Sequence, residues 1–192
     1  NEVLDAPYDR KHPTKRHRPA AAEKVRRSIA LAEWLLLGAA GIGLGLVVHP
    51  YFAASAAALW VMGIVYNVHP IRTKELPYLD VLSESVNNAI RLLLGWFALI
   101  QSQVPPVSLI IAYWMAGAFF MAIKRFAEYR QIGDAKTARR YRRSFKHYSE
   151  DRLLVSAFFY AVLAALFTGV FIVRYHLELI LILPLVAGFF AY

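Results

Sequence analysis

The sequence predicts an all-α protein, a polytopic bundle of transmembrane helices, on the strength of three observations. Hydrophobic residues make up 58% of the chain and the mean hydropathy is +0.42, which exceeds the values of ordinary soluble domains. Apolar stretches long enough to cross a bilayer recur along the chain. The connections between these stretches alternate between strongly basic segments and short ones, as in proteins that cross a membrane repeatedly.

Six apolar segments are expected to form helices when a window of about nineteen residues is moved along the chain. In chain order they are 28–48, 51–66, 79–100, 107–123, 153–173 and 177–192. Between the fourth and fifth segments, residues 129–143 are polar and are expected to form a surface helix with an interruption at Gly133, since glycine is unfavourable inside helices.

One domain accounts for the whole chain, because no loop is long enough to hold a soluble domain and no strong internal repeat is present. Residues 1–192 are therefore predicted to form a single transmembrane helical domain. The chain starts at Asn1 and stops at Tyr192 inside an apolar run, so we expect this domain to be incomplete at both ends.

Positive charge is concentrated in three connections, and the net charge is +9. These connections precede the first segment, follow the second and follow the fourth, which puts them all on one side of the bundle. Because lysine and arginine favour cytoplasmic loops, this side is expected to face the cytoplasm and the protein to lie in the cytoplasmic membrane. Topology and attraction to anionic lipids explain much of the charge, so it is not a sign of nucleic-acid binding.

The absence of cysteine excludes a disulfide framework, a thiolate metal site and a cysteine nucleophile. A metal ion must therefore be held by oxygen atoms or by histidine. The first nineteen residues, NEVLDAPYDRKHPTKRHRP, contain acids followed by bases. Asn1, Asp5 and Asp9 recur every four residues, so on a helix they share one face and can converge on one Mg²⁺ ion, with Glu2 beside them.

Magnesium usually keeps several waters and bridges one or two carboxylates to substrate phosphates, so bases that could bind phosphate are expected nearby. The candidates that follow the acids are Arg10, Lys15, Arg16 and Arg18. The alternative is a solvated end of an amphipathic helix, in which the acids and bases only complement the helix dipole and the membrane surface.

The motif N-E-x-x-D-x-x-x-D resembles the N-D-x-x-D-x-x-x-D motif of the UbiA superfamily of intramembrane prenyltransferases, with Glu2 at the position of an aspartate. The resemblance implies a bundle of nine transmembrane helices, of which this chain holds about six. It also implies two acidic motifs on cytoplasmic loops that bind Mg²⁺ and a lipid diphosphate. On this pattern Asp5 and Asp9 are catalytic, and the metal ligands are Asn1, Glu2, Asp5 and Asp9.

Polar residues after the second segment extend the candidate site. Tyr66, Arg72 and Lys74 stand where this superfamily carries a tyrosine and a lysine, and the two bases are candidate phosphate ligands. The third segment then places polar residues on one helical face. An ionisable group at membrane depth costs roughly 2.5 to 3.5 kcal/mol, so this face is expected to line a cavity or to satisfy neighbouring helices. The residues assigned to a substrate cavity are Tyr66, Asp80, Glu84, Asn87, Asn88, Arg91 and Glu128.

The loop after the fourth segment departs from the superfamily pattern. A second cluster of aspartates is expected there, but the sequence reads KRFAEYR, with Lys124, Arg125 and Glu128. The two bases are candidates for direct contact with substrate phosphate, in place of a second metal ion. The alternative is an ordinary salt bridge between Lys124 and Glu128, worth a few tenths of a kcal/mol.

This departure and the D-R-x-H-P-x-K-R-x-R-P run over residues 9–19 are similar to the decaprenyl-phosphate phosphoribosyltransferase branch of the superfamily. Members of that branch move a 5-phosphoribosyl group from phosphoribosyl diphosphate to a polyprenyl phosphate. The resemblance therefore implies a Mg²⁺-dependent transferase with these two substrates. Two alternatives are kept: prenyl transfer from a prenyl diphosphate to an aromatic acceptor, and a non-catalytic scaffold or transporter that does not depend on Asp5 and Asp9.

Overall fold

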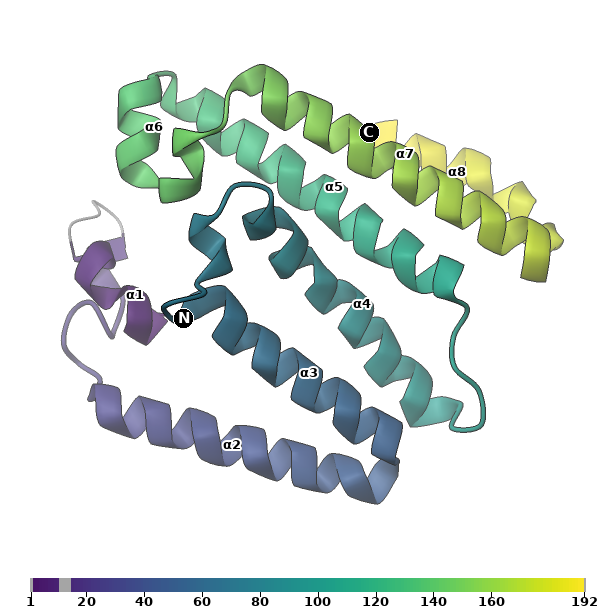
Figure 1. The fold of residues 1–192 in the computed structure, drawn as a ribbon, viewed down its shortest axis with the longest axis horizontal. Coiled ribbons are helices and arrows are strands. Elements are labelled where there is room, and N and C mark those ends of the chain that lie inside the picture. The colour runs from purple at the N-terminus through teal and green to yellow at the C-terminus, as the bar shows by residue number, and fades with distance from the viewer. Residues whose placement is uncertain (1, 11–14, 192) are drawn as a thin grey trace.

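The structure, a computed structural model, describes residues 2–10 and 15–191, and helices are its regular elements throughout these ranges (Figure 1). The long helices are α2 (Arg27–Val48), α3 (Pro50–Asn67), α4 (Leu79–Leu99), α5 (Val107–Ile132) and α7 (Glu150–Tyr175). The short elements are α1 (Glu2–Asp9), η1 (Lys15–His17), η2 (Thr73–Glu75), α6 (Ala135–Tyr141), η3 (Arg143–Lys146), η4 (Leu177–Ile182) and α8 (Leu183–Ala191). The predicted all-α fold class is confirmed.

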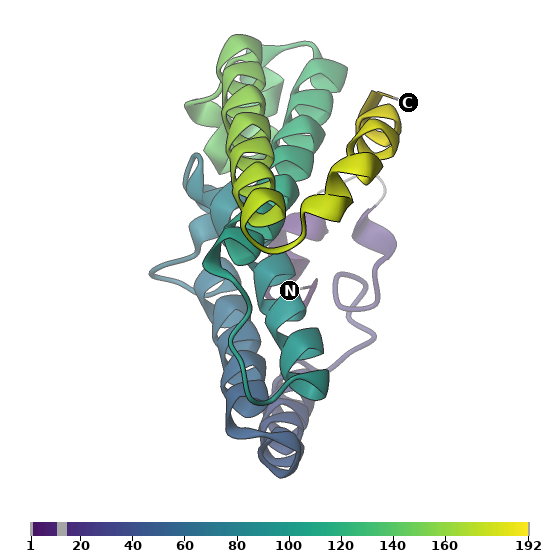
Figure 2. The same cartoon turned by 90° about the vertical axis from the view of Figure 1, so that its right-hand side faces the viewer.

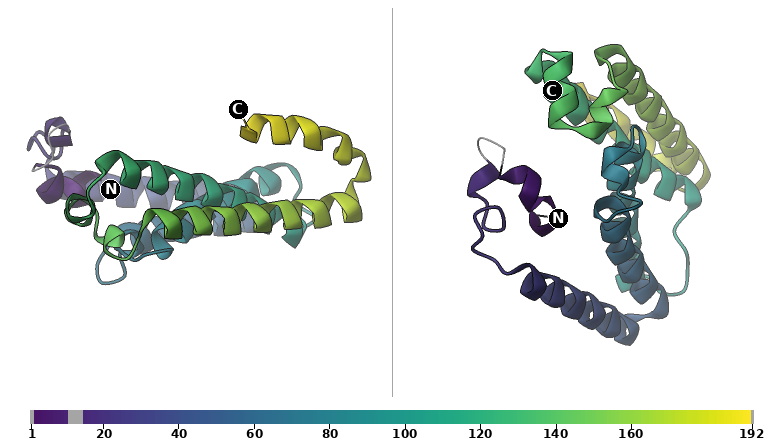
Figure 3. Two further views of the ribbon diagram at one scale, coloured as in Figure 1. Left: turned by 90° about the horizontal axis from the view of Figure 1, so that it is seen from above. Right: turned by 60° about the vertical axis from the view of Figure 1, so that its left-hand side comes forward.

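The long helices follow one another in alternating directions, each packed on the next along the chain from α2 to α5, and α5 also packs on α7. In Figure 1 the short elements α1, η2 and α6 gather at one end of this array, whereas the connections from α2 to α3 and from α4 to α5 lie at the other end. Figures 2 and 3 show that α8 turns back toward the end from which α7 started.

Among the described residues, three helices, α2, α5 and α7, are long and apolar enough to cross a membrane. Large apolar side chains on their outer faces are exposed, for example Leu36 and Leu37 on α2 and Val155 on α7. Exposed apolar surface of this extent is expected for a helical bundle that is surrounded by lipid.

The helix boundaries agree closely with the prediction for the first three segments and differ for the others. α5 continues beyond residue 123 to Ile132 and ends at Gly133, whose φ of 68° lies in the left-handed region that favours glycine. α6 follows, with the carboxylate of Asp134 accepting hydrogen bonds from the backbone N–H groups of Lys136 and Thr137. The interruption expected at Gly133 is therefore present. The last predicted segment divides into η4 and α8.

Two buried clusters hold the array together. The first joins α4, α5 and α7 and contains Ala118, Ala122 and Ala157, each at most 1% exposed, whose small size lets these helices approach closely. The second contains Phe145 and Leu153, both fully buried. It packs residues 134–148, named here the basic segment, against α5 and α7, and so gives the bundle a folded cap at one end.

Candidate functional site

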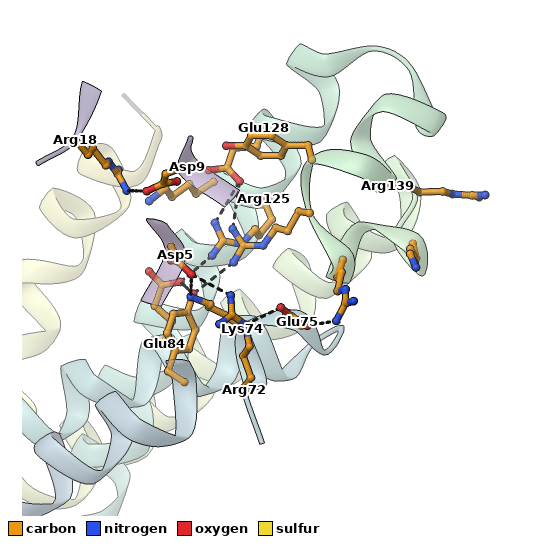
Figure 4. Close-up of a pocket in the computed structure, with 16 residues that line it drawn as sticks. Asp5, Asp9, Arg18, Arg72, Lys74, Glu75, Glu84, Arg125, Glu128 and Arg139 are labelled. Carbon is orange, nitrogen blue, oxygen red and sulfur yellow. Dashed lines mark hydrogen bonds and ion pairs between the residues drawn. The ribbon is translucent and has the colours of Figure 1, made fainter. Parts of the chain in front are cut away.

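A cavity of about 620 Å³ lies at the end of the bundle where α1, η2 and the basic segment gather (Figure 4). Nine bases, five acids and two tyrosines line it, so positive charge is in excess and the cavity suits an anionic ligand. The bases are Arg18, Arg72, Lys74, Lys124, Arg125, Arg139, Arg142, Arg143 and Lys146, the acids are Asp5, Asp9, Glu75, Glu84 and Glu128, and the tyrosines are Tyr66 and Tyr141.

Two of the acids expected to hold magnesium, Asp5 and Asp9, line this cavity and lie one turn apart on α1. Oδ1 of Asp5 accepts hydrogen bonds from Nη2 of Arg72 at 3.0 Å and from Nζ of Lys74 at 2.5 Å. Oδ2 of Asp9 accepts from Nη1 of Arg18 at 3.0 Å. Figure 4 shows Asp5 directed at the two bases of the η2 loop. The ion pairs of Asp5 hold α1 against a loop that is distant in the sequence, whereas that of Asp9 is local.

Three other candidates of the amino-terminal stretch, Glu2, Arg10 and Arg16, are not among the residues that line the cavity. Oε1 of Glu2 accepts a hydrogen bond from the backbone N–H of Ala20 at 3.0 Å and so fastens the loop after η1. Arg10 forms an ion pair of 3.0 Å with Glu23, and Arg16 is exposed. Asn1 and the side chain of Lys15 fall outside the part of the chain that the structure describes.

Arg72 and Lys74 occupy the loop that carries η2. Arg72 has φ 34° and ψ 59°, a left-handed conformation that is unfavourable for a residue with a Cβ atom. Its side chain is 8% exposed and also donates to Oε1 of Glu75 at 2.6 Å, so its ion pairs hold this backbone in place. Burial lowers the pKa of Lys74, because the loss of water penalises the ammonium more than Asp5 stabilises it.

Arg125 joins three acids at the centre of the site. Its side chain is only 3% exposed, and its Nη2 donates to Oε2 of Glu84 at 2.8 Å. Its Nε and Nη1 donate at 3.3 Å to Asp80 and Glu128, respectively. Glu84 also accepts from the hydroxyl of Tyr66 at 2.8 Å. Arg125 therefore links α4 to α5, in addition to lining the cavity.

Four residues of the predicted polar face of α4 do not line the cavity. Asp80 is fully buried and bonded within the protein. Asn88 packs so closely against Gly117 of α5 that a Cβ atom there would lie 2.4 Å from its Nδ2. Arg91 donates to Oδ1 of Asn88 at 3.4 Å, and Oδ1 of Asn87 is buried with no hydrogen-bond partner among the described residues. Asp80 and Asn88 thus serve contacts between α4 and α5, whereas Arg91 is exposed.

Six residues that line the cavity were not predicted from the sequence. The many bases in residues 136–146 indicate that this segment could contribute to an anion site. Their pattern alone does not show which of them face the cavity. These residues are Glu75, Arg139, Tyr141, Arg142, Arg143 and Lys146.

The acids that line the cavity are all engaged in ion pairs. Glu75 bridges Arg72 and Arg143, the latter at 2.8 Å. Burial alone raises the pKa of Glu75, but the hydrogen bonds and charges of these two arginines outweigh it, so the pKa lies below 4.5. Lys124 differs from the bases that pair with these acids. It is exposed and forms no hydrogen bond or ion pair within residues 2–10 and 15–191.

The carboxylates of Asp5 and Asp9 fit a Mg²⁺ ion that is also bound by water and by substrate phosphate. They project from one helix into one cavity, and two carboxylates are a usual protein contribution to such a site. Within the described ranges, three or more histidine, aspartate or glutamate side chains do not converge as a metal site. A magnesium ion at α1 would therefore depend on oxygen atoms of the substrate.

Comparisons with known proteins agree with this architecture. The model of the UbiA prenyltransferase family matches residues 1–192. The structure of a UbiA homolog from Archaeoglobus fulgidus has a TM-score of 0.75 with this chain at 18% identity, covering 97% of this chain and 65% of that one, which shows a shared fold. The protoheme IX farnesyltransferase of Korarchaeum cryptofilum (strain OPF8) is 30% identical over 120 residues, which are 60% of this chain and 40% of that protein.

Proposed function

Because the chain belongs to the UbiA prenyltransferase family, we propose that it is a membrane transferase that moves a 5-phosphoribosyl group from phosphoribosyl diphosphate to a polyprenyl phosphate. The observation that carries this proposal is the excess of bases around the cavity, to which α5 and the basic segment contribute six. The two substrates bring a diphosphate, a sugar phosphate and a lipid phosphate to one site. A prenyl diphosphate alone brings much less negative charge.

In the proposed reaction, an oxygen of the lipid phosphate forms a bond to C1 of the ribose. The bond from C1 to the diphosphate oxygen breaks, and diphosphate leaves with the electron pair. The attacking phosphate oxygen is already anionic at neutral pH, so no side chain has to act as a strong base. The work of the protein is to position two anionic substrates and to balance their charge.

Asp5 and Asp9 are the residues that would hold Mg²⁺. When bound, this ion neutralises charge on the leaving diphosphate. Arg72 and Lys74 keep Asp5 at the cavity from the η2 loop, and Arg18 does the same for Asp9. The η2 loop, remote in the sequence, thus orients Asp5, whereas the nearby Arg18 orients Asp9.

Lys124 is the base best suited to contact a substrate phosphate directly. It lines the cavity and has no partner in the described part of the chain, so binding a phosphate breaks no existing ion pair. Arg125, in contrast, already serves Asp80, Glu84 and Glu128. We therefore assign phosphate contact to Lys124 and the orientation of the surrounding acids to Arg125.

Prenyl transfer to an aromatic acceptor is the second candidate. It is favoured by the 30% identity to the protoheme IX farnesyltransferase of Korarchaeum cryptofilum over 120 residues. In that reaction the lipid itself carries the leaving diphosphate. The same pair of acids, Asp5 and Asp9, would serve either reaction, so the acids do not discriminate between them.

The test offers both substrate pairs to the purified full-length protein with Mg²⁺. One reaction contains ribose-labelled phosphoribosyl diphosphate and polyprenyl phosphate, and we expect the label in the lipid fraction. The other contains labelled farnesyl diphosphate with protoheme IX or a phenol. Label in the aromatic product only would overturn the proposal in favour of prenyl transfer. The substitution Glu23→Gln, at an exposed acid outside the cavity, is the matched control for substitutions of Asp5.

We also propose that the cavity faces the cytoplasm and that the protein resides in the cytoplasmic membrane. Bases from three connections line the cavity: Arg18 after α1, Arg72 and Lys74 in the η2 loop, and four bases of the basic segment (Figure 4). Lysine and arginine are enriched in loops that stay on the cytoplasmic side.

A further inference from the structure

Asp80 is a buried charge that lies behind the cavity, at the start of α4. It is fully buried, yet three side chains from other elements donate hydrogen bonds to it. Oδ1 accepts from the hydroxyl of Tyr148 at 2.7 Å, and Oδ2 accepts from Oγ of Ser144 at 3.0 Å and from Nε of Arg125 at 3.3 Å. A buried carboxylate is tolerated only when such partners satisfy it, so this set of contacts is specific.

We infer that Asp80 is a positioning residue, which fixes the basic segment against α4 and α5 and thereby sets where the bases of that segment lie along the cavity. Ser144 and Tyr148 belong to the basic segment, and Arg125 belongs to α5. One carboxylate therefore joins three parts of the structure. The bases of the segment that line the cavity are Arg139, Arg142, Arg143 and Lys146.

Other contacts of the basic segment cannot replace this anchor. Phe145 is fully buried between Tyr129 and Tyr148, but apolar contacts are not directional and do not set a register by themselves. The ion pair between Arg143 and Glu75 connects the segment to η2, but the side chain of Arg143 is 62% exposed, and exposed pairs contribute little. Arg142 of the segment also donates to the hydroxyl of Tyr66 at 3.4 Å, but its side chain is 21% exposed. Among the contacts of the described residues, those of Ser144 and Tyr148 with Asp80 are both directional and buried.

Tyr148 extends the anchor to the backbone at the start of α4. Its hydroxyl donates to Asp80 and accepts a hydrogen bond from the backbone N–H of Tyr78 at 2.5 Å. Burial and the charge of Asp80 raise the pKa of Tyr148, so the hydroxyl stays protonated and keeps donating. Tyr78 itself has φ 64°, a conformation that needs support from such contacts.

The first test measures the docking of the basic segment by limited trypsin digestion of the full-length protein in lipid nanodiscs. The bases of residues 136–146 supply the cleavage sites. For Asp80→Asn we expect cleavage within these residues to be on the order of tenfold faster than in the wild type, because the lost charge weakens three hydrogen bonds and favours local opening. Asp151→Asn, at an exposed acid in the first turn of α7, is the matched control and should digest at the wild-type rate.

If Asp80→Asn does not accumulate as folded protein, Tyr148→Phe removes one of the three hydrogen bonds and should accelerate cleavage at the same sites to a smaller extent. Unchanged cleavage in the variant that folds would overturn the inference. This comparison uses no substrate, so it stands apart from the proposed function.

The second test measures substrate affinity and rests on the proposed function. In Asp80→Asn the KM for phosphoribosyl diphosphate should rise about tenfold, with a much smaller change in kcat, because displaced bases weaken the hold on phosphate. A fall in kcat at unchanged KM would overturn the positioning role, since it reports only a loss of folded enzyme. If the wild type itself does not use this donor, the proposed function fails, and the digestion comparison still decides the role of Asp80.

Discussion

The ammonium group of Lys74 lies 2.5 Å from Oδ1 of Asp5, although 69 residues separate the two in the sequence. This contact brings an acid of the amino-terminal helix to a base of the η2 loop at the rim of one cavity. A residue proposed to hold magnesium is thus oriented by a loop that lies between α3 and α4. Through this contact, α1 and the η2 loop contribute side chains to the same cavity.

Substitution of Asp5 or Asp9 should abolish most of the transferase activity. For Asp5→Asn and Asp9→Asn we expect a loss of at least about a hundredfold, because the charge that would bind the metal and balance the diphosphate is removed. Activity is measured as a function of Mg²⁺ concentration, with Glu23→Gln as the control. Wild-type activity with an unchanged Mg²⁺ dependence would show that these acids have no such role.

Lys124→Met should weaken substrate binding without lowering the stability of the fold. Since Lys124 is exposed and lacks an intramolecular partner in the described ranges, the melting temperature should change little, whereas the KM for the phosphorylated donor should rise about tenfold. Lys136→Met, at an exposed base of α6 outside the cavity lining, is the control. A marked loss of stability without a change in KM would contradict the assignment.

Arg125→Gln should destabilise the fold strongly. The substitution leaves the carboxylates of Asp80, Glu84 and Glu128 without their shared cation, and breaking a buried pair by removing one partner costs about 3 to 5 kcal/mol. The melting temperature in detergent should fall well below that of Arg130→Gln, which alters an exposed arginine of the same helix. Equal melting temperatures for the two variants would contradict the central role of Arg125.

Glu75 should make stability depend on pH in the acidic range. Its pKa in the fold lies below the ordinary value of 4.5, so its ion pairs with Arg72 and Arg143 contribute fully above pH 4.5. The contribution is lost as the pH falls from 4.5 through the lowered pKa. The difference in melting temperature between the wild type and Glu75→Gln should therefore be largest near neutral pH and shrink in acid. A difference that stays constant down to pH 3 would argue against this ion pair.

The lack of cysteine makes the proposed orientation testable with single introduced thiols. Lys24→Cys lies in the connection from η1 to α2, and Figure 1 shows the start of α2 at the same end of the bundle as α1; Ser102→Cys lies in the connection from α4 to α5 at the opposite end. A membrane-impermeant maleimide should label Lys24→Cys in inverted vesicles and Ser102→Cys in right-side-out vesicles. The reverse pattern would place the cavity outside the cytoplasm.

Hydropathy predicts most of the helices here because burial in lipid depends on composition over a long window. It misses the extension of α5 to Ile132, since residues 124–132 are too polar for a membrane segment but still favour a helix until Gly133. It also misses the division between η4 and α8. The signal for that division is Pro184, which suits the first turn of a new helix and not the interior of a long one.

The sequence was also informative about the acids of α1 and the bases of the η2 loop and α5, which the structure arranges around one cavity. Local spacing could not predict the contribution of the basic segment, because its position depends on Asp80, more than sixty residues away from Ser144 and Tyr148. The spacing of polar residues on α4 predicts that Asp80 lines the cavity, whereas the structure buries it. A helical face can be read from the sequence, but the element that covers it is decided by tertiary packing.

All the side chains that line the cavity come from one end of the bundle. The far halves of the helices contribute no described side chain to this cavity, and their outer faces carry exposed apolar residues that suit lipid. Homologues in bilayers of different thickness could lengthen or shorten those halves by a turn and keep the same chemistry. The protein should therefore tolerate substitutions in the α2–α3 and α4–α5 turns far better than in the η2 loop.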